Sequence, residues 1–135
     1  MKYDNDNIFA KILRGEIPCK KIFENDYVLS FHDINPQKKI HALVIPKGEY
    51  IDYDDFNKKA SDKEILEFHK AVSHVSSLLG ASVKGYRVLS NIGSDGGQEV
   101  PHLHFHIFAG EKIGKMVAWD EKGSKIFFRL WIFKQ

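Results

Sequence analysis

Residues 102–108 read His-Leu-His-Phe-His-Ile-Phe, so imidazole and large apolar side chains alternate along the segment. In an extended strand successive side chains point to opposite faces, which places His102, His104 and His106 together on one face. On a helix the same spacing would spread the histidines around the axis and leave the apolar residues without a common face. The pattern therefore predicts a strand over residues 102–108 that backs a row of imidazoles with a hydrophobic core.

The row of imidazoles suits either catalysis or metal binding, and its spacing alone does not choose between them. Imidazole serves as a general acid or base, a nucleophile or a metal ligand. A His-x-His pair with one further ligand would make an open zinc site. The cupin metal-binding pattern is incomplete in both registers: Gly96 suits His102 but no acid follows, and Glu111 suits His104 but no glycine precedes. The chain also lacks Cys-x-x-Cys, so catalysis is favoured.

A glycine-containing loop at residues 91–98, Asn-Ile-Gly-Ser-Asp-Gly-Gly-Gln, lies just before the histidines. Glycines permit positive φ and let backbone N–H groups approach an anion, although the same composition is typical of an ordinary turn. No Gly-Lys-Ser/Thr loop and no Gly-x-Gly-x-x-Gly fingerprint occurs, which argues against P-loop hydrolysis and dinucleotide binding. The loop is therefore a candidate anion site of another kind.

Asp33 follows an alternating apolar strand and precedes an Asn-Pro turn. A carboxylate at such a strand end can accept hydrogen bonds from sugar hydroxyls, or it can cap the turn. The sequence leaves both roles open.

The remaining pattern predicts an α+β domain over residues 1–135, with an antiparallel five-stranded sheet, one short helix and one long helix. The short helix is expected at residues 8–14 and ends at Gly15. The long helix is expected at 62–79, with a Ser61/Glu64 capping box and termination at Gly80. The strands are expected at residues 21–24, 27–32, 40–46, 86–91 and 102–108.

Several motifs resemble the histidine triad superfamily, and most closely its branch of histidine triad nucleotide-binding proteins. Besides the His-x-His-x-His segment, they lie in the family's order and spacing at residues 7–12, 15–18, 31–34, 41–47 and 95–98. The resemblance extends over about residues 7–108. It implies the fold of that family and a homodimer built along the long helix and a sheet edge.

The resemblance also implies a role for each site residue. His104 would be the nucleophile that attacks the α-phosphorus of a nucleotide, with His102, His106 and His41 as orienting and proton-handling partners. The residues implied to contact the nucleotide fall into three groups: an apolar slot for the base (Ile8, Phe9, Ile12, Phe31, Ile34), Asp33 with neighbouring His32 at the ribose, and Asn91, Gly97, Gln98 and Glu99 along the phosphate.

The implied activity is that of a purine nucleoside phosphoramidase, which releases AMP or GMP through a covalent nucleotidyl-histidine intermediate. Two alternatives stay open. The protein could hydrolyse dinucleoside polyphosphates, or it could be a purine-nucleotide-binding or interaction module whose hydrolysis is incidental.

The sequence departs from the family pattern in three places. Asn7 and Ala10 stand where many members carry a zinc-binding Cys-x-x-Cys, so no metal and no cofactor are predicted. Glu99 stands where a serine is common, which leaves the proton donor for the leaving group open. Residues 109–135 form a divergent extension that begins Ala-Gly-Glu, and its apolar segment 126–133 predicts a further strand.

Charge and composition exclude other classes. The formal net charge is +2, and the lysine pairs are separated and interleaved with acids, so no basic groove for nucleic acid is expected. No apolar stretch approaches the length of a membrane span, and no signal segment is recognised. The lone Cys19 suits a reducing compartment, so a cytoplasmic location is expected. His69 and His74, on the long helix, are expected to lie outside the site.

Overall fold

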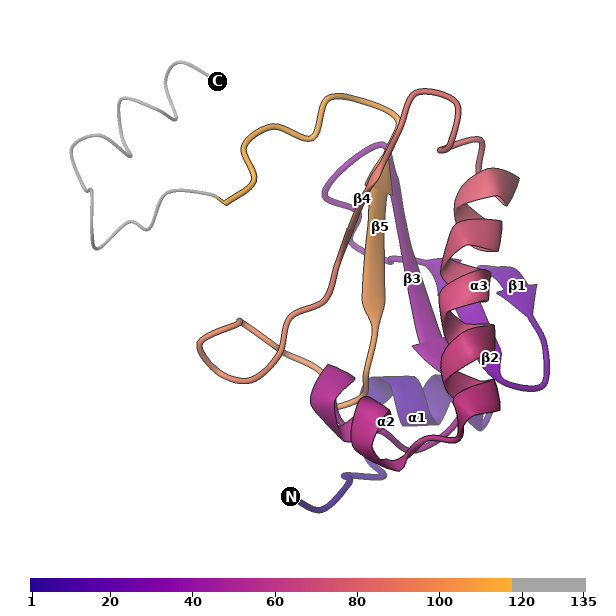
Figure 1. The fold of residues 1–135 in the computed structure, drawn as a ribbon, viewed down its shortest axis with the longest axis vertical. Coiled ribbons are helices and arrows are strands. Elements are labelled where there is room, and N and C mark those ends of the chain that lie inside the picture. Colours follow the sequence, from indigo (N-terminus) through magenta and orange to yellow (C-terminus); the bar gives the residue numbers. More distant parts are fainter. Residues whose placement is uncertain (118–135) are drawn as a thin grey trace.

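The computed structural model describes residues 1–117. Its elements follow the chain as α1 (Ile8–Leu13), β1 (Lys21–Glu24), β2 (Val28–His32), β3 (Ile40–Pro46), α2 (Tyr53–Lys59), α3 (Asp62–Leu78), β4 (Arg87–Leu89) and β5 (Phe105–Ala109) (Figure 1). Within these residues no helix has both the length and the apolar character that a membrane span needs. The strand predicted at 126–133 lies outside the described residues.

The five strands form one antiparallel sheet in the order β1-β2-β3-β5-β4, which confirms the predicted α+β class. The helix α3 runs alongside β3 on one side of the sheet, and α1 and α2 lie near one end of it (Figure 1). β4 pairs with β5 and stands last in the strand order, so it forms an edge of the sheet.

The long helix α3 begins and ends as the sequence predicts. The Ser61 hydroxyl accepts from the Glu64 N–H at 3.1 Å, and the Glu64 carboxylate accepts from the Ser61 N–H at 3.1 Å, which completes the capping box. Gly80 follows with φ +73°, a conformation that favours glycine. The buried stripe of α3 packs on apolar residues of the sheet: Phe68, Val72 and Val75 lie in one cluster with Val28, Val44, Leu103 and Ile107.

The opposite face of the sheet carries a smaller cluster and the site. Alternation along β3 sends Val44 toward α3 and sends Leu43 and Ile45 to the other face. There, Leu43 and Ile45 pack with Phe9 of α1 and with Phe31 of β2. Because α1 covers only one end of this face, the histidines are placed beside it rather than beneath α3.

The structure differs from the sequence prediction at the start of β5, which begins at Phe105 rather than at residue 102. Pro101 has no N–H for a ladder, and the next two N–H groups bond elsewhere: His102 donates to the Val100 carbonyl and Leu103 to the Tyr50 carbonyl. Only His106 of the three histidines therefore lies within the strand. The last predicted strand segment before the glycine loop is also shorter, Arg87–Leu89 rather than 86–91.

A second difference is the short helix α2, which the expected pair of one long and one short helix does not include. Only Phe56 is buried along its seven residues, so the segment lacks the apolar periodicity that predicts a helix. Its sequence signal is instead an N-cap and an ordered distribution of charge. The Asp52 side chain accepts from the Asp55 N–H at 2.8 Å, acidic residues occupy the first turn, and lysines occupy the last turn.

Candidate active site

Two histidines meet on the face that α1 leaves open. In the β3·β5 register His41 is opposite Phe108 and Leu43 is opposite His106, so His41 and His106 are diagonal neighbours on the same face. His41 Nε2 lies 2.9 Å from His106 Nδ1. Asp33, just after β2, brings its Oδ2 to 3.4 Å from the same His41 nitrogen. The structure thus gathers two of the predicted histidines and the predicted aspartate.

Backbone partners determine which nitrogen of each ring carries the proton. The Gln37 N–H can only donate, and it lies 3.1 Å from Nδ1 of His41, so that nitrogen accepts. A neutral His41 therefore carries its proton on Nε2 and donates it to Nδ1 of His106. It follows that neutral His106 holds its own proton on Nε2.

His104 is oriented in the complementary sense. Its Nδ1 lies 2.7 Å from the His102 carbonyl, and because a carbonyl only accepts, Nδ1 carries the proton. The lone pair is left on Nε2. The ring is buried, with Phe9 packed edge-on at a centroid distance of 4.9 Å and His106 at 5.1 Å. His104 is therefore a neutral imidazole with a fixed tautomer beside a donor.

His102 contributes differently from the row that the sequence predicts. Its ring is fully buried, and its Nε2 lies 2.9 Å from the Pro46 carbonyl, to which it must donate. Its backbone carbonyl, not its ring, accepts from His104. The expected orienting role thus lies on the main chain of His102.

Burial keeps all four imidazoles neutral near pH 7, because the charged form loses its hydration. Burial lowers the pKa of His102 and of His106 to about 4. It also lowers the pKa of His104 and His41, in each case against the opposing influence of the Asp33 charge. The site therefore presents uncharged ring nitrogens, some of which donate while others keep a lone pair.

The apolar slot expected for a base divides into two parts. Phe9 and Phe31 are buried within the small core, and Ile12 packs against it half-buried. Ile8 and Ile34 are exposed, with 45% and 90% of their surface accessible. The structure therefore puts three of the five predicted slot residues in the small core and leaves Ile8 and Ile34 exposed.

The polar residues predicted at the site lie as follows. Asp33 Oδ1 accepts from the Asn35 N–H at 2.8 Å, so the turn-capping role predicted as an alternative is present. The second oxygen, Oδ2, faces His41. His32 and Glu99 are exposed, and Asn91 is half-buried at the start of the glycine loop.

Hydrogen bonds close the glycine loop in this structure. Gly97, with φ +78°, donates its N–H to the Ser94 carbonyl at 3.1 Å. The Gln98 N–H donates to the Gly93 carbonyl at 3.0 Å, and the Gln98 amide donates to the carbonyls of Ile51 and Val100. Gly97 and Gln98 are expected along a phosphate. In this conformation their hydrogen bonds instead close the loop.

One group of donors within residues 1–117 is close enough together to hold a metal ion: Asp33, His41 and His106, with ligand atoms within 4.8 Å of one another. Two imidazoles and a carboxylate suit zinc or non-haem iron. However, the Gln37 N–H occupies Nδ1 of His41, so Nε2 of the neutral ring carries a proton and offers no lone pair. The tautomers inferred from these hydrogen bonds therefore favour the hydrogen-bonded arrangement over metal ligation.

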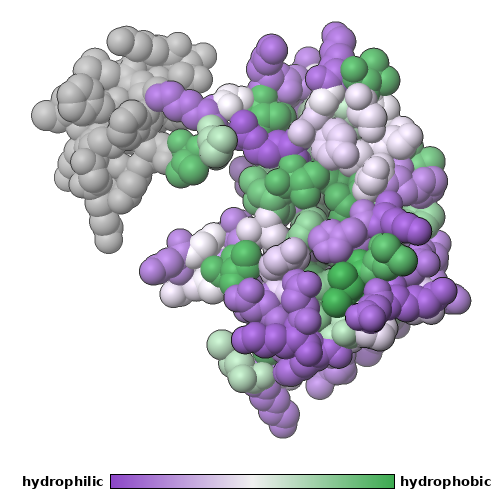
Figure 2. All heavy atoms as spheres, viewed as in Figure 1, coloured by the Kyte–Doolittle hydropathy of each residue, from purple (hydrophilic) through white to green (hydrophobic). Residues whose placement is uncertain are grey.

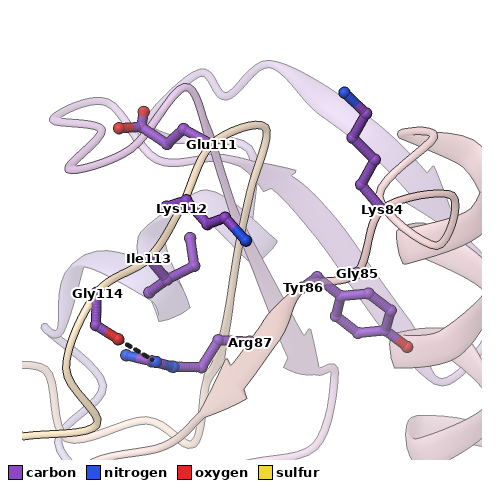
Figure 3. Close-up of a pocket in the computed structure, with 8 residues that line it drawn as sticks. All are labelled: Lys84, Gly85, Tyr86, Arg87, Glu111, Lys112, Ile113 and Gly114. Atoms are coloured by element: carbon purple, nitrogen blue, oxygen red, sulfur yellow. Dashed lines mark hydrogen bonds between the residues drawn. The ribbon is translucent and has the colours of Figure 1, made fainter.

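Two hollows lie away from the histidines. Apolar side chains are exposed near the middle of the face seen in Figure 2. One hollow, of about 380 Å³, is lined on α3 by Asp62, Ile65, Leu66 and His69. The other, of about 310 Å³, lies between the segments at residues 84–87 and 111–114, where Arg87 donates to the Gly114 carbonyl at 2.9 Å (Figure 3). Neither is lined by the site histidines.

The sequence did not indicate three groups that shape the site: the Gln37 N–H, the Pro46 carbonyl and the Tyr3 hydroxyl, which lies 2.5 Å from His102 Nδ1. Main-chain groups carry no side-chain signature. Tyr3 had a weak one, as an aromatic residue in an otherwise polar terminal segment.

Comparisons with known proteins agree with this geometry. A family model described as HIT domain matches residues 14–113. An uncharacterized 13.2 kDa HIT-like protein of Azospirillum brasilense is 56% identical over 116 residues, covering 86% of this chain and 95% of that protein. A solved HIT family hydrolase from Clostridium thermocellum is 33% identical with a TM-score of 0.75, covering 84% and 99% of the two chains. A solved histidine triad nucleotide-binding protein from Candida albicans is 27% identical with a TM-score of 0.68, covering 96% of each.

Proposed function

The chain belongs to the HIT domain family, and from that premise we propose that it is a nucleotide hydrolase, more narrowly a purine nucleoside phosphoramidase. One observation carries the proposal: the buried, neutral His104 has its Nδ1 proton held by the His102 carbonyl, which leaves Nε2 as a nucleophile. A HIT family hydrolase and a histidine triad nucleotide-binding protein among the similar structures support the general class.

In the first step, His104 Nε2 attacks the α-phosphorus, a phosphorus–nitrogen bond to His104 forms, and the bond to the leaving amine breaks. The imidazole becomes positively charged, and its Nδ1–H remains directed at the His102 carbonyl, which stabilises that charge. In the second step water attacks the same phosphorus, the bond to Nε2 breaks, and the nucleoside monophosphate leaves.

His106 is the donor nearest to His104 along this face. With its Nδ1 accepting from His41, its Nε2–H is available to a non-bridging phosphate oxygen, where it would stabilise developing charge. The departing amine takes up one proton, and the attacking water gives one up. Glu99, near enough to raise the pKa of His104 by its charge, is the exposed carboxyl that we assign to this exchange with solvent.

For the nucleotide, Ile8 and Ile34 offer exposed apolar surface to a purine, while Phe9 and Phe31 lie buried in the small core. Asp33 is assigned to the ribose hydroxyls, to which its Oδ2 can turn from His41. Gly97 would reach a phosphate only by giving up its bond to the Ser94 carbonyl, so phosphate binding is expected to reopen the loop turn.

The first test compares His104→Ala with the wild-type protein on adenosine phosphoramidate, with AMP release as the readout. Loss of the nucleophile should lower kcat by a factor of about 10³ or more. His74→Ala is the matched control, because His74 is exposed on α3 and contacts Phe23 rather than the site. Its kcat should stay near that of the wild type.

The second measurement locates the intermediate. Reactions are quenched in base, since a phosphorus–nitrogen bond to imidazole hydrolyses in acid, and the labelled peptide is identified by mass spectrometry. We expect the nucleotide on His104. Nucleotide on another residue, or higher kcat/KM for a dinucleoside polyphosphate than for the phosphoramidate, would contradict the proposal.

We also propose that the protein is a homodimer, joined through β4 and α3. β4 is an edge strand, and Val83, Tyr86 and Val88 expose apolar surface on and around it. Leu66 and Leu78 do so on α3. An exposed edge with apolar neighbours is a typical surface for pairing with a second copy.

A further inference from the structure

We propose that Tyr3 is a positioning residue for His104 and acts on it through His102. The proposal rests on the assignment of His104 as the nucleophile. Tyr3 precedes the residues 14–113 that match the family model, and it touches neither His104 nor His106. Its role follows from the hydrogen bonds of the His102 ring.

The Tyr3 hydroxyl and His102 Nδ1 are 2.5 Å apart, and the two rings meet edge-on at a centroid distance of 5.6 Å. Since His102 Nε2 must donate to the Pro46 carbonyl, Nδ1 of the neutral ring is an acceptor. The Tyr3 hydroxyl is therefore the donor. Both nitrogens of a fully buried imidazole are thus satisfied, one by Pro46 and one by Tyr3.

The anchored ring helps to fix where the His102 carbonyl points. Residues 102–104 precede β5, so they have no strand ladder to hold them. The Leu103 N–H shares the peptide plane of the His102 carbonyl and donates to the distant Tyr50 carbonyl at 2.8 Å, so this bond and the anchored ring together orient that carbonyl. The His102 carbonyl, in turn, fixes the Nδ1–H of His104 at 2.7 Å. Tyr3 is accordingly two hydrogen bonds away from the nucleophile.

The terminal segment is itself tied to α1. Asn7 donates from its side chain to the Asp4 carbonyl at 2.7 Å, and its Oδ1 caps α1 by accepting from Ala10. The next residue but one, Phe9, packs edge-on against both His102 and His104. Tyr3 therefore holds His102 by a hydrogen bond, and Phe9 contacts both His102 and His104.

The test is Tyr3→Phe, which removes the hydroxyl and keeps the ring. Because Tyr3 acts on orientation rather than on substrate binding, kcat should fall by about ten- to a hundredfold while KM stays within about twofold. Ser76→Ala is the control: it also removes a hydrogen-bonded hydroxyl, here a buried one on α3 that donates to the Val72 carbonyl at 2.9 Å. Its kcat should remain within about twofold of the wild type.

A readout that does not depend on turnover is the ¹⁵N NMR spectrum of the imidazole rings. In Tyr3→Phe the His102 Nδ1 signal should move to the position of an unbonded nitrogen, and the His104 ring signals should shift as its Nδ1–H bond loosens. Ser76→Ala should leave both sets of signals in place.

The outcomes separate this inference from the proposed activity. If the wild type turns over no phosphoramidate but Tyr3→Phe still shifts the His104 signals, the activity assignment fails and the positioning role stands. If Tyr3→Phe leaves the His104 signals unchanged, or if Ser76→Ala lowers kcat equally, the positioning role is overturned.

Discussion

The buried histidines should make the folded protein sensitive to mild acid, and His102 offers the clearest case. Its ring is fully buried, and burial lowers its pKa from an ordinary 6.5 to about 4. Between these values the unfolded chain binds a proton that the folded protein does not. Stability therefore rises with pH across this window and is lost as pH falls below 6.5.

The magnitude follows from the width of the window. Between pH 6.5 and about pH 5, each pH unit lowers the free energy of unfolding by about 1.4 kcal/mol, because the imidazole binds a proton only in the unfolded chain. The total loss over this interval is about 2 kcal/mol for His102 alone. The free energy of unfolding of a domain is typically about 5–15 kcal/mol, so this loss is roughly a fifth of a mid-range value. His106, with its pKa lowered to about 4, adds to the same trend.

The perturbation is His102→Gln, because an amide offers one donor for the Pro46 carbonyl and one acceptor for the Tyr3 hydroxyl without titrating. Urea unfolding is followed at about pH 7 and about pH 5 for both proteins. The wild type should lose about 2 kcal/mol more than the variant over that interval. Equal losses would show that His102 is not held neutral by burial, and would refute the reasoning.

Two further predictions concern the helix start and the sheet edge. Ser61→Ala removes the side chain that caps α3 at 3.1 Å and should lower the free energy of unfolding by about 1 kcal/mol, measured in urea, with kcat unchanged; an unaltered midpoint would contradict the capping role. Val88→Lys places a charge on the exposed edge strand β4 and should shift the protein from dimer to monomer in sedimentation equilibrium, whereas Lys at exposed Asn57 of α2 should not; a wild-type monomer would refute the interface.

Local patterns were sufficient for most elements. The capping box and apolar stripe placed α3 within a residue of its observed end, because both signals act over one or two helical turns. Alternation identified the apolar side of β5 in the same way, and a continuous apolar segment closed by proline identified β3. The predicted start of β5 was wrong, because Pro101 has no N–H and the Leu103 N–H donates to the Tyr50 carbonyl, which is distant in sequence. The strand therefore begins only at Phe105. α2 was missed because a helix with one buried side chain has no periodicity to detect.

The sequence by itself determined which chemistry the protein carries: three imidazoles spaced by two, a fourth at His41, an acid at Asp33 and an apolar backing. These properties are written in residue types and short spacings. Only the tertiary structure decided how the imidazoles differ. The Gln37 N–H sets the proton on His41, the Pro46 carbonyl and the Tyr3 hydroxyl set that on His102, and the His102 carbonyl sets that on His104. The physical reason is that a tautomer depends on its hydrogen-bond partners, and Tyr3 meets His102 across 99 positions of chain.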